Sequence, residues 1–254
     1  MNIAEFAAFY NDLLYINNFA ADPSNNGLQV CGNEEKPCRK AAFAVDASLA
    51  SIEKALAENA DILVVHHGLS WGGGIRRWAG VDGKRFAAMF KGDLSLYAMH
   101  LPLDAHAIYG NNAILADLAD LHERKMFFPY HGMDIGVLGE MAETTAEKAA
   151  SLAANGKEFK LYLSPLKSDK VKKVAIISGG GGFDGLESSI AAGVDMLITG
   201  EFDHTMYHIV QENKIHVAAL GHYNSEVHGV QSLQKVAAGK LGLETVFIDI
   251  PTGL

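Results

Sequence analysis

Uninterrupted apolar runs alternate along this chain with segments whose apolar residues recur at helical spacing. Ile62–Val65 is a run of four aliphatic residues, and a similar run lies within Val194–Thr199. Runs without polar alternation are typical of strands buried on both faces of a parallel sheet. Between the runs, residues 48–59 place apolar side chains on one helix face behind Ser48, a residue type that caps helix N-termini. The alternation predicts an α/β architecture.

The same pattern predicts elements along the whole chain. Helices are expected at residues 3–18, 48–59, 83–91, 111–121, 144–153, 185–192, 205–213 and 230–241. Strands are expected at residues 28–31, 41–45, 62–65, 94–99, 172–178, 194–199, 215–220 and 245–250, with a short strand near 162 and strand-and-turn material at 126–138.

Two parts of the chain repeat the same order of residues and predicted elements. A helix, an aspartate and a buried strand occur in succession at Asp61 and again at Asp195. The next strand ends in a similar polar motif each time, H-x-x-x-D-x-H from His100 and H-x-x-x-E-x-H from His222. Several matches in one order indicate an internal repeat.

The repeat predicts two similar, interlinked α/β lobes with a metal cleft between them. The first lobe is expected to span residues 1–125 and the second residues 126–254, and the strand near 245–250 is a candidate to return to the first lobe. If the lobes face each other, the loops after equivalent strands meet across the cleft. Ligands of open α/β sheets gather beyond the carboxyl ends of the strands, so the site is expected there.

Two adjacent histidines follow the buried run at Ile62–Val65 and precede the glycine-rich segment Gly68–Gly74. His66 and His67 would lie at the carboxyl end of that strand, on roughly opposite sides if the strand geometry persists. The glycines let the backbone turn close to a bound group. The alternative is that one histidine packs in the core while the other is solvated.

The cleft would gather imidazole and carboxylate side chains from both lobes. They are His66, His67, His100 and Asp104 from the first lobe, and His222 and Glu226 from the second. Neutral imidazole with carboxylate is a ligand set for divalent zinc, iron and manganese. This number of ligands exceeds what a structural site needs and fits two ions with a bridging carboxylate. Such a pair of ions acidifies a bound water molecule and polarises the group that the water attacks.

Not every polar residue of these motifs need be a ligand. His100 is a candidate neighbour of the ligands or a general acid, and we assign it the catalytic role. His106 and His228 are more simply interpreted as hydrogen-bonding to backbone. The sequence leaves two roles open for Glu201, contact with substrate or exposure at the surface.

Two further segments leave alternatives open. Gly179–Gly182 follows a strand and precedes a helix, so its amides could bind an anion, although a tight turn is the simpler interpretation. Trp71, Arg76, Arg77 and Trp78 could hold a phosphate or a base, or could pack at a subunit contact.

Composition narrows the function classes. The chain has 254 residues, is 49% apolar and carries a formal net charge of −9. The acidic balance argues against a general nucleic-acid or anionic-membrane surface. No apolar run approaches the roughly 18–20 residues that cross a bilayer. Two cysteines are too few for a disulfide framework, so a cytoplasmic location is the simplest expectation.

Five motifs occur in a fixed order from Asn26 onward. They are Asn26-Gly-Leu-Gln-Val30, His66-His67-Gly68, Tyr97-Ala-Met-His-Leu-Pro-Leu-Asp104, Leu197-Ile-Thr-Gly-Glu201 and Gly221-His-Tyr-Asn-Ser-Glu226. Together they resemble the Nif-three-like family, also catalogued as GTP cyclohydrolase 1 type 2 homologs. The resemblance runs over nearly the whole chain.

The resemblance implies a two-lobed α/β protomer in a toroidal homohexamer, with metal sites that face its interior. It also implies a dinuclear site whose ligands map onto five residues of the expected types, His66, His67, Asp104, His222 and Glu226. The cyclohydrolase label implies water attack on a purine nucleotide ring.

Two functions remain open at this point. The first is a metal-dependent hydrolase that uses two divalent ions on a nucleotide or another small phosphorylated or cyclic amide substrate. The second is a non-catalytic, ring-shaped scaffold that binds metal or a partner. DNA binding inside a ring is disfavoured by the net charge of −9.

Overall fold

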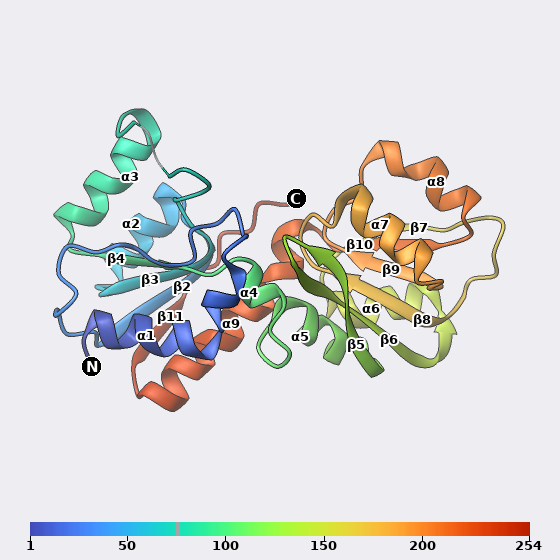
Figure 1. The fold of residues 1–254 in the computed structure, drawn as a ribbon, viewed down its shortest axis with the longest axis horizontal. Helices are drawn as coiled ribbons and strands as arrows, with labels where there is room; N and C mark the ends of the chain where they lie inside the picture. The colour runs from blue at the N-terminus through green and yellow to red at the C-terminus, as the bar shows by residue number, and fades with distance from the viewer. Residues whose placement is uncertain (75–76) are drawn as a thin grey trace. The chain divides into compact units, whose positions relative to one another are not determined.

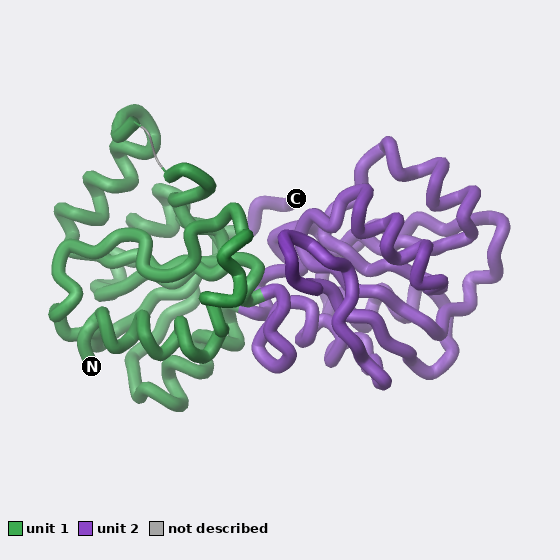
Figure 2. The backbone as a smooth tube through the Cα atoms, viewed as in Figure 1, with its two compact units in different colours: residues 1–103, 230–250 green, residues 104–229, 251–254 purple. Residues whose placement is uncertain are grey.

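The computed structural model describes residues 1–74 and 77–254, and this part of the chain divides into two compact units, coloured separately in Figure 2. The ranges are 1–103 with 230–250 for unit 1, and 104–229 with 251–254 for unit 2. Each unit contains a β-sheet with helices packed against it (Figure 1), which confirms the predicted α/β class.

The predicted lobes are a different kind of division from these compact units. Each compact unit combines two separate segments of the chain, whereas each predicted lobe is one continuous segment. The lobe boundary expected at residue 125 stays a prediction.

The sheet of unit 1 has the strand order β1-β4-β3-β2-β11. The four strands from β4 to β11 in this order run parallel, and β1 joins the edge antiparallel to β4. The strands are β1 (Gly27–Val30), β2 (Lys40–Asp46), β3 (Ile62–His67), β4 (Ser95–Ala98) and β11 (Glu244–Phe247). The helices are α1 (Ile3–Leu13), α2 (Leu49–Ala57) and α3 (Gly80–Lys91), with a 3₁₀ turn at Ile16–Phe19.

Helices cover both faces of this sheet. Leu63 and Val65 of β3 pack in one cluster with Ile52 of α2. On the other face, Tyr97 of β4 meets α1, where its ring centroid lies 6.4 Å from that of Phe6. The whole aliphatic run of β3 is fully buried, as its lack of polar alternation predicts.

The first helix is shorter than the sequence predicts. α1 ends at Leu13 instead of continuing to residue 18, because Tyr15 adopts a left-handed φ of 51° and a 3₁₀ turn follows it. The predicted cap of α2 is confirmed, since the Ser48 hydroxyl accepts from the Ser51 amide at 3.1 Å.

The sheet of unit 2 has the strand order β5-β6-β8-β9-β10-β7. Three neighbouring strands, β8, β9 and β10, are parallel, and the others pair antiparallel with their neighbours. The strands are β5 (His122–Tyr130), β6 (Met133–Thr145), β7 (Lys160–Tyr162), β8 (Lys170–Ile177), β9 (Met196–Thr199) and β10 (His216–Ala219). The helices are α5 (Asn111–Leu118), α6 (Ala146–Ala154), α7 (Gly182–Ala191) and α8 (Tyr207–Glu212), with a 3₁₀ turn at His204–Met206.

Two helices, α4 (Leu101–Asp104) and α9 (His222–Leu241), contain residues of both units.

Successive residues of β8 face different helices in unit 2. Ile176 packs with Leu115 of α5 and with the alanines of α6, among them Ala150. Ile177 faces α7, where a Cβ on Gly185 would lie 2.8 Å from its Cδ1. Glycine at this position therefore lets α7 approach the sheet closely.

Matching hydrogen bonds hold the parallel strands of the two units. In unit 1, Asp61 Oδ2 accepts from the amides of residues 39 and 40 at 2.8 and 3.1 Å. In unit 2, Asp195 Oδ2 accepts from the amides of residues 172 and 173 at 3.0 and 2.9 Å. Each aspartate directly precedes the central strand, β3 or β9. The internal repeat expected from the sequence thus has the same local structure in both units.

The strand register shows which residues of the two units are equivalent. β2 pairs Ala41 with Ile62, and β8 pairs Val174 with Met196. The same register extends to β4 in unit 1 and to β10 in unit 2. It makes three residues at the strand ends of unit 1 equivalent to glycines of unit 2. The equivalent pairs are Asp46 with Gly179, His66 with Gly200, and His100 with Gly221. The sequence match of His100 with His222 is therefore displaced by one residue.

We predict that Asp195→Ala lowers the free energy of unfolding by about 1–3 kcal/mol, because two amides of β8 lose their acceptor. Burial alone would raise the pKa of Asp195, but hydrogen bonds from Lys167 and the two amides outweigh it and hold the pKa below its ordinary value. The contribution is therefore present above the unfolded-state carboxyl pKa and is lost as the pH falls through the lowered folded-state pKa. Urea unfolding at neutral and acid pH measures both effects.

The matched control is Asp134→Ala, an exposed aspartate of β6. We expect a change within about 0.5 kcal/mol for this surface substitution. Equal losses in the two variants would contradict the role given to Asp195.

Candidate metal centre

Three histidines of unit 1 converge at the carboxyl ends of β3 and β4. His66 and His67 end β3, and His100 follows β4 by two residues. Their ring centroids are 4.6 Å apart for His66 and His67, 5.2 Å for His66 and His100, and 5.7 Å for His67 and His100. One potential ligand atom from each lies within 4.8 Å of the other two.

Each of these imidazoles is held through its Nδ1 atom by an oxygen acceptor at 2.9 Å. His66 Nδ1 donates to the Met99 carbonyl, His67 Nδ1 to Asp46 Oδ1, and His100 Nδ1 to Asp22 Oδ1. Because carbonyl and carboxylate oxygens only accept, these contacts place the proton on Nδ1. Metal-binding histidines are typically oriented this way, with the Nε2 lone pair left to the ion.

Asp22 organises the loop around His100. Its buried carboxylate also accepts from the Ser24 amide, the Asn26 side chain and the Leu101 amide, at 2.8–3.0 Å. Burial alone would raise the pKa of Asp22, but hydrogen bonds from His100, Asn26 and Ser24 outweigh it and lower the pKa. The aspartate is therefore charged at neutral pH and suited to orient an imidazole.

Gln29 of β1 holds the turn that follows the two adjacent histidines. Its Oε1 accepts from the amides of Leu69 and Ser70 at 2.8 and 3.0 Å. A Cβ on Gly68 would overlap the Gln29 side chain. The Gln29 and Gly68 positions of the family-like motifs thus act together in placing this loop.

In unit 2, two carboxylates occupy one polar region. Asp104 Oδ1 accepts from Asn111 Nδ2 at 2.9 Å and from Ser178 Oγ at 3.0 Å. Both Asp104 and Glu226 are buried, and an oxygen of one lies within 4.8 Å of an oxygen of the other. Carboxylates this close repel each other unless a proton or a cation lies nearby.

His222 lies between two glutamates. Its Nδ1 donates to Glu201 Oε1 at 2.7 Å, and its Nε2 lies 3.1 Å from Oε1 of Glu226, one turn along α9. The hydrogen bond to Glu226 and, to a smaller degree, the one to Glu201 raise the pKa of His222 to about 9 against the opposing effect of burial. Without a metal ion the imidazole is therefore protonated at neutral pH.

Glycine at the end of β8 makes room for these side chains. Gly179 has a left-handed φ of 62°, and a Cβ at this position would overlap the Glu226 carboxylate. The Gly179 amide donates to Ser225 Oγ at 2.8 Å, which links the strand end to α9.

Comparison with known proteins identifies the family. The family model described as Duf34/NIF3 (NGG1p interacting factor 3) matches residues 1–253. A curated relative from Archaeoglobus fulgidus, named GTP cyclohydrolase 1 type 2 homolog, is 47% identical over 256 residues, with both chains fully covered. The chain belongs to the Duf34/NIF3 family.

Solved structures of similar proteins agree with this assignment. The protein ybgI, described as a structural-genomics target of unknown function, aligns with a TM-score of 0.90 at 31% identity, covering 100% of both chains. Reduced HcgD from Methanocaldococcus jannaschii aligns with a TM-score of 0.87 at 27% identity, covering 98% of both chains. The family resemblance seen in the sequence is thereby confirmed.

The donor chemistry of this Duf34/NIF3 protein fits divalent metal ions. Unit 1 offers three imidazoles whose Nδ1 atoms are hydrogen-bonded to oxygen acceptors. Unit 2 offers one such imidazole and two carboxylates. Nitrogen and oxygen donors of this kind suit zinc, iron or manganese. The protein therefore contains side-chain groups that could bind metal.

Several residues around these groups were not predicted from the sequence. Asp22 and Asp46, which hold His100 and His67, come from a turn and from the end of another strand. Two residues hold Asp104 by hydrogen bonds. Ser178 is 74 positions away in the sequence, and Asn111, although only seven positions away, belongs to no motif that marks it as a partner. The available signal was the charged residue that ends the buried strand β2, Asp46.

The remaining polar motifs have the following surroundings. His106 Nδ1 accepts from the amides of residues 108 and 109, which is the backbone role expected for it. Trp71 Nε1 donates to the Gly68 carbonyl, and Trp78 packs on Phe86 with 4.2 Å between ring centroids. Arg76 lies outside the described residues.

In the part of the chain that the structure describes, no helix has both the length and the apolarity required to cross a bilayer.

We predict that Glu226→Gln lowers the pKa of His222 in metal-free protein, and that it does so by more than Glu201→Gln. The reason is that the Glu226 hydrogen bond is the largest cause of the raised pKa. The raised pKa stabilises the fold fully below about 6.5, and this contribution is lost as the pH rises through about 9.

Titration of the His222 ring by NMR after chelator treatment measures this pKa in the wild type and both variants. An unchanged titration in Glu226→Gln, or a larger effect of Glu201→Gln, would contradict the assignment.

Proposed function

We propose that this protein binds two divalent metal ions through His66, His67, Asp104, His222 and Glu226, and that it is a metal-dependent hydrolase. The observation that carries the proposal is shared by all three proposed imidazole ligands. In each, Nδ1 donates to an oxygen atom at 2.7–2.9 Å, so that Nε2 is the atom that would bind an ion. In His222 an ion would take the place of the proton that Nε2 shares with Glu226.

The two carboxylates support a dinuclear rather than a mononuclear centre. Asp104 and Glu226 are buried acidic groups with oxygens within 4.8 Å of each other, a spacing that cations would stabilise. Divalent ions bound there would supply Lewis acidity, which polarises an attacked group and acidifies water.

The chain itself would supply orientation and proton transfer. Asn111 and Ser178 donate to the same oxygen of Asp104, which limits rotation of that carboxylate. His100 is proposed as the general acid, because Asp22 holds the proton on its Nδ1 and leaves Nε2 to exchange a proton with substrate. An aspartate in this position also stabilises the imidazolium form.

The substrate class follows from the family relation as a proposal. The curated relatives are named GTP cyclohydrolase 1 type 2 homologs, and the name points to attack of water on a purine nucleotide. We propose a nucleotide or another small phosphorylated or cyclic amide substrate. The ring-shaped homohexamer implied by the family resemblance and a cytoplasmic location are part of the same proposal.

We predict that His67→Ala or Glu226→Ala strips bound metal while the fold is retained. Loss of one ligand from a shared set weakens binding strongly, whereas neither residue belongs to the apolar core clusters: His67 ends β3, and Glu226 lies near the start of α9. Elemental analysis gives the metal content, and circular dichroism checks the fold. His208→Ala, an exposed histidine of α8, is the control and should keep its metal. Full metal content in both ligand variants would refute the site.

We predict turnover by the metal-loaded protein of at least one compound among GTP, cyclic amides and phosphoesters. Chelator treatment should abolish the activity, and His100→Ala should reduce it by about 10²–10⁴-fold, the usual contribution of a general acid. Chromatographic product analysis is the measurement. Absence of turnover with zinc, iron and manganese would favour the non-catalytic scaffold.

A further inference from the structure

A cavity of about 560 Å³ lies within unit 2, beyond the carboxyl ends of its parallel strands. Gly180 follows β8, Gly200 follows β9, and Leu220 and Gly221 follow β10, and all four line it. Open α/β sheets bind their ligands at this edge. The volume is in the range of small-molecule sites, about 300–1,000 Å³.

The equivalent strand ends of unit 1 carry side chains where unit 2 carries glycine. Gly200 and Gly221 line the cavity, and their equivalents in unit 1 are His66 and His100. The repeat has therefore placed imidazoles at one set of strand ends and glycines at the other. The strand ends of unit 2 that border the cavity thus present main chain where unit 1 presents imidazoles.

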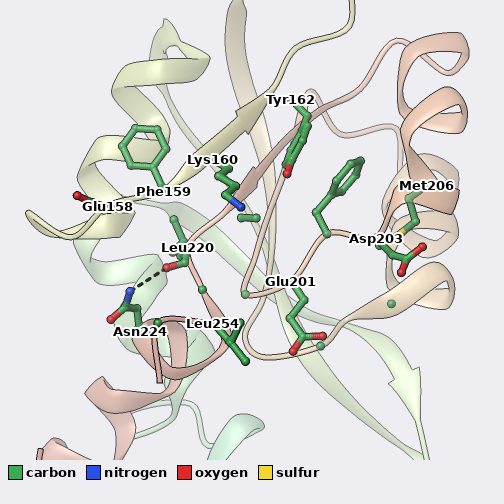
Figure 3. A pocket seen from close by; sticks show the side chains of 17 residues that line it. Glu158, Phe159, Lys160, Tyr162, Glu201, Asp203, Met206, Leu220, Asn224 and Leu254 are labelled. Atoms are coloured by element: carbon green, nitrogen blue, oxygen red, sulfur yellow. Dashed lines mark hydrogen bonds between the residues drawn. The ribbon is translucent and has the colours of Figure 1, made fainter. Parts of the chain in front are cut away.

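One wall of the cavity is aromatic. Tyr162, at the end of β7, stacks on Phe202 with 4.0 Å between ring centroids and 26° between ring planes. Both rings are partly exposed. Figure 3 shows Tyr162 with its hydroxyl group toward the cavity and Lys160 beside it. The outer face of such a stacked pair can bind the face of a further planar ring.

The charged groups of the cavity exclude a phosphate as the main binding group. Lys160 is the single cationic side chain among its lining residues in the described chain, whereas Glu158, Glu201 and Asp203 are carboxylates. Carboxylates accept hydrogen bonds from N–H groups, and the lysine donates to a carbonyl oxygen. The lining thus matches an uncharged ring that carries both an N–H and a carbonyl group.

Glu201 connects this cavity to a proposed metal ligand. The glutamate lines the cavity, and its Oε1 accepts from His222 Nδ1 at 2.7 Å. A ring bound to the free face of Glu201 would therefore lie beside the imidazole that the proposed function assigns to metal binding.

We infer that this cavity binds a planar, uncharged cyclic amide, such as a nucleobase, through stacking on the outer face of the Tyr162–Phe202 pair and hydrogen bonds to Glu201 and Lys160. The inference rests on the proposed function for its reaction, since it selects the cyclic amide among the substrate classes. Binding itself needs only residues of unit 2, so it is testable on protein without metal.

The test is isothermal titration of the full chain, after chelator treatment, with uridine and inosine. Both nucleosides carry a lactam N–H and a carbonyl group. We expect binding of at least one of them, and roughly tenfold weaker binding to Phe202→Ala and Tyr162→Ala, the size expected for loss of one stacked ring. Tyr130→Ala, which removes an exposed tyrosine of β5 outside the cavity, should bind like the wild type.

Two further measurements leave Tyr162 and Phe202 unchanged, so they do not depend on whether the alanine variants of these residues fold. The 3-methyluridine analogue lacks the ring N–H and should bind at least fivefold more weakly than uridine to the wild type, if uridine is the ligand. Lys160→Gln, a substitution on an edge strand, should weaken nucleoside binding while circular dichroism stays unchanged.

Three results would overturn the inference. They are no binding of either nucleoside at millimolar concentration, binding of uridine 5′-phosphate more than tenfold tighter than uridine, and displacement of the nucleoside by inorganic phosphate. Each concerns metal-free protein, whereas the proposed function fails if His67→Ala and Glu226→Ala retain metal. The two failures are therefore distinguishable.

Discussion

This structure depends on a pair of hydrogen bonds that two consecutive backbone amides donate to one aspartate oxygen. Asp61 and Asp195 each make this pair of bonds, and each directly precedes the central strand of its sheet. The bond fixes where the central strand begins relative to its neighbour, and a shift by one residue would reverse every side chain. The residues at the other end of the strand are then placed by counting, which is how His67 comes opposite Asp46.

Placement alone does not make an imidazole a ligand, because the ring can still rotate and exchange its proton between nitrogens. The oxygen acceptors at Nδ1 remove that freedom in His66, His67 and His100. Ordering these rings in advance reduces the entropy that metal binding would otherwise cost. The acceptors differ, one carbonyl and two carboxylates, so the basicity of the three Nε2 atoms differs as well.

Much of this arrangement follows from the sequence, and the rest does not for definable reasons. Buried runs predicted the strands, and the residue types at their ends predicted the proposed ligands, because both are local. Asp22 was not predicted as the partner of His100, since 78 positions separate them and only the fold brings them together. The end of α1 at Leu13 depends on the left-handed conformation of Tyr15, for which no glycine or asparagine gave a signal.

The offset between the two polar motifs explains how a repeat can carry similar chemistry on different supports. His100 is equivalent to Gly221, so His222 lies one residue beyond the position equivalent to His100 and begins α9. On a helix, residues four apart share a face, which brings His222 and Glu226 within 3.1 Å. Side chains that rise from a helix need space above the strand ends, and Gly179 supplies it, since a Cβ there would overlap Glu226. Glycine at the end of β8 is thus required by a carboxylate that a helix carries.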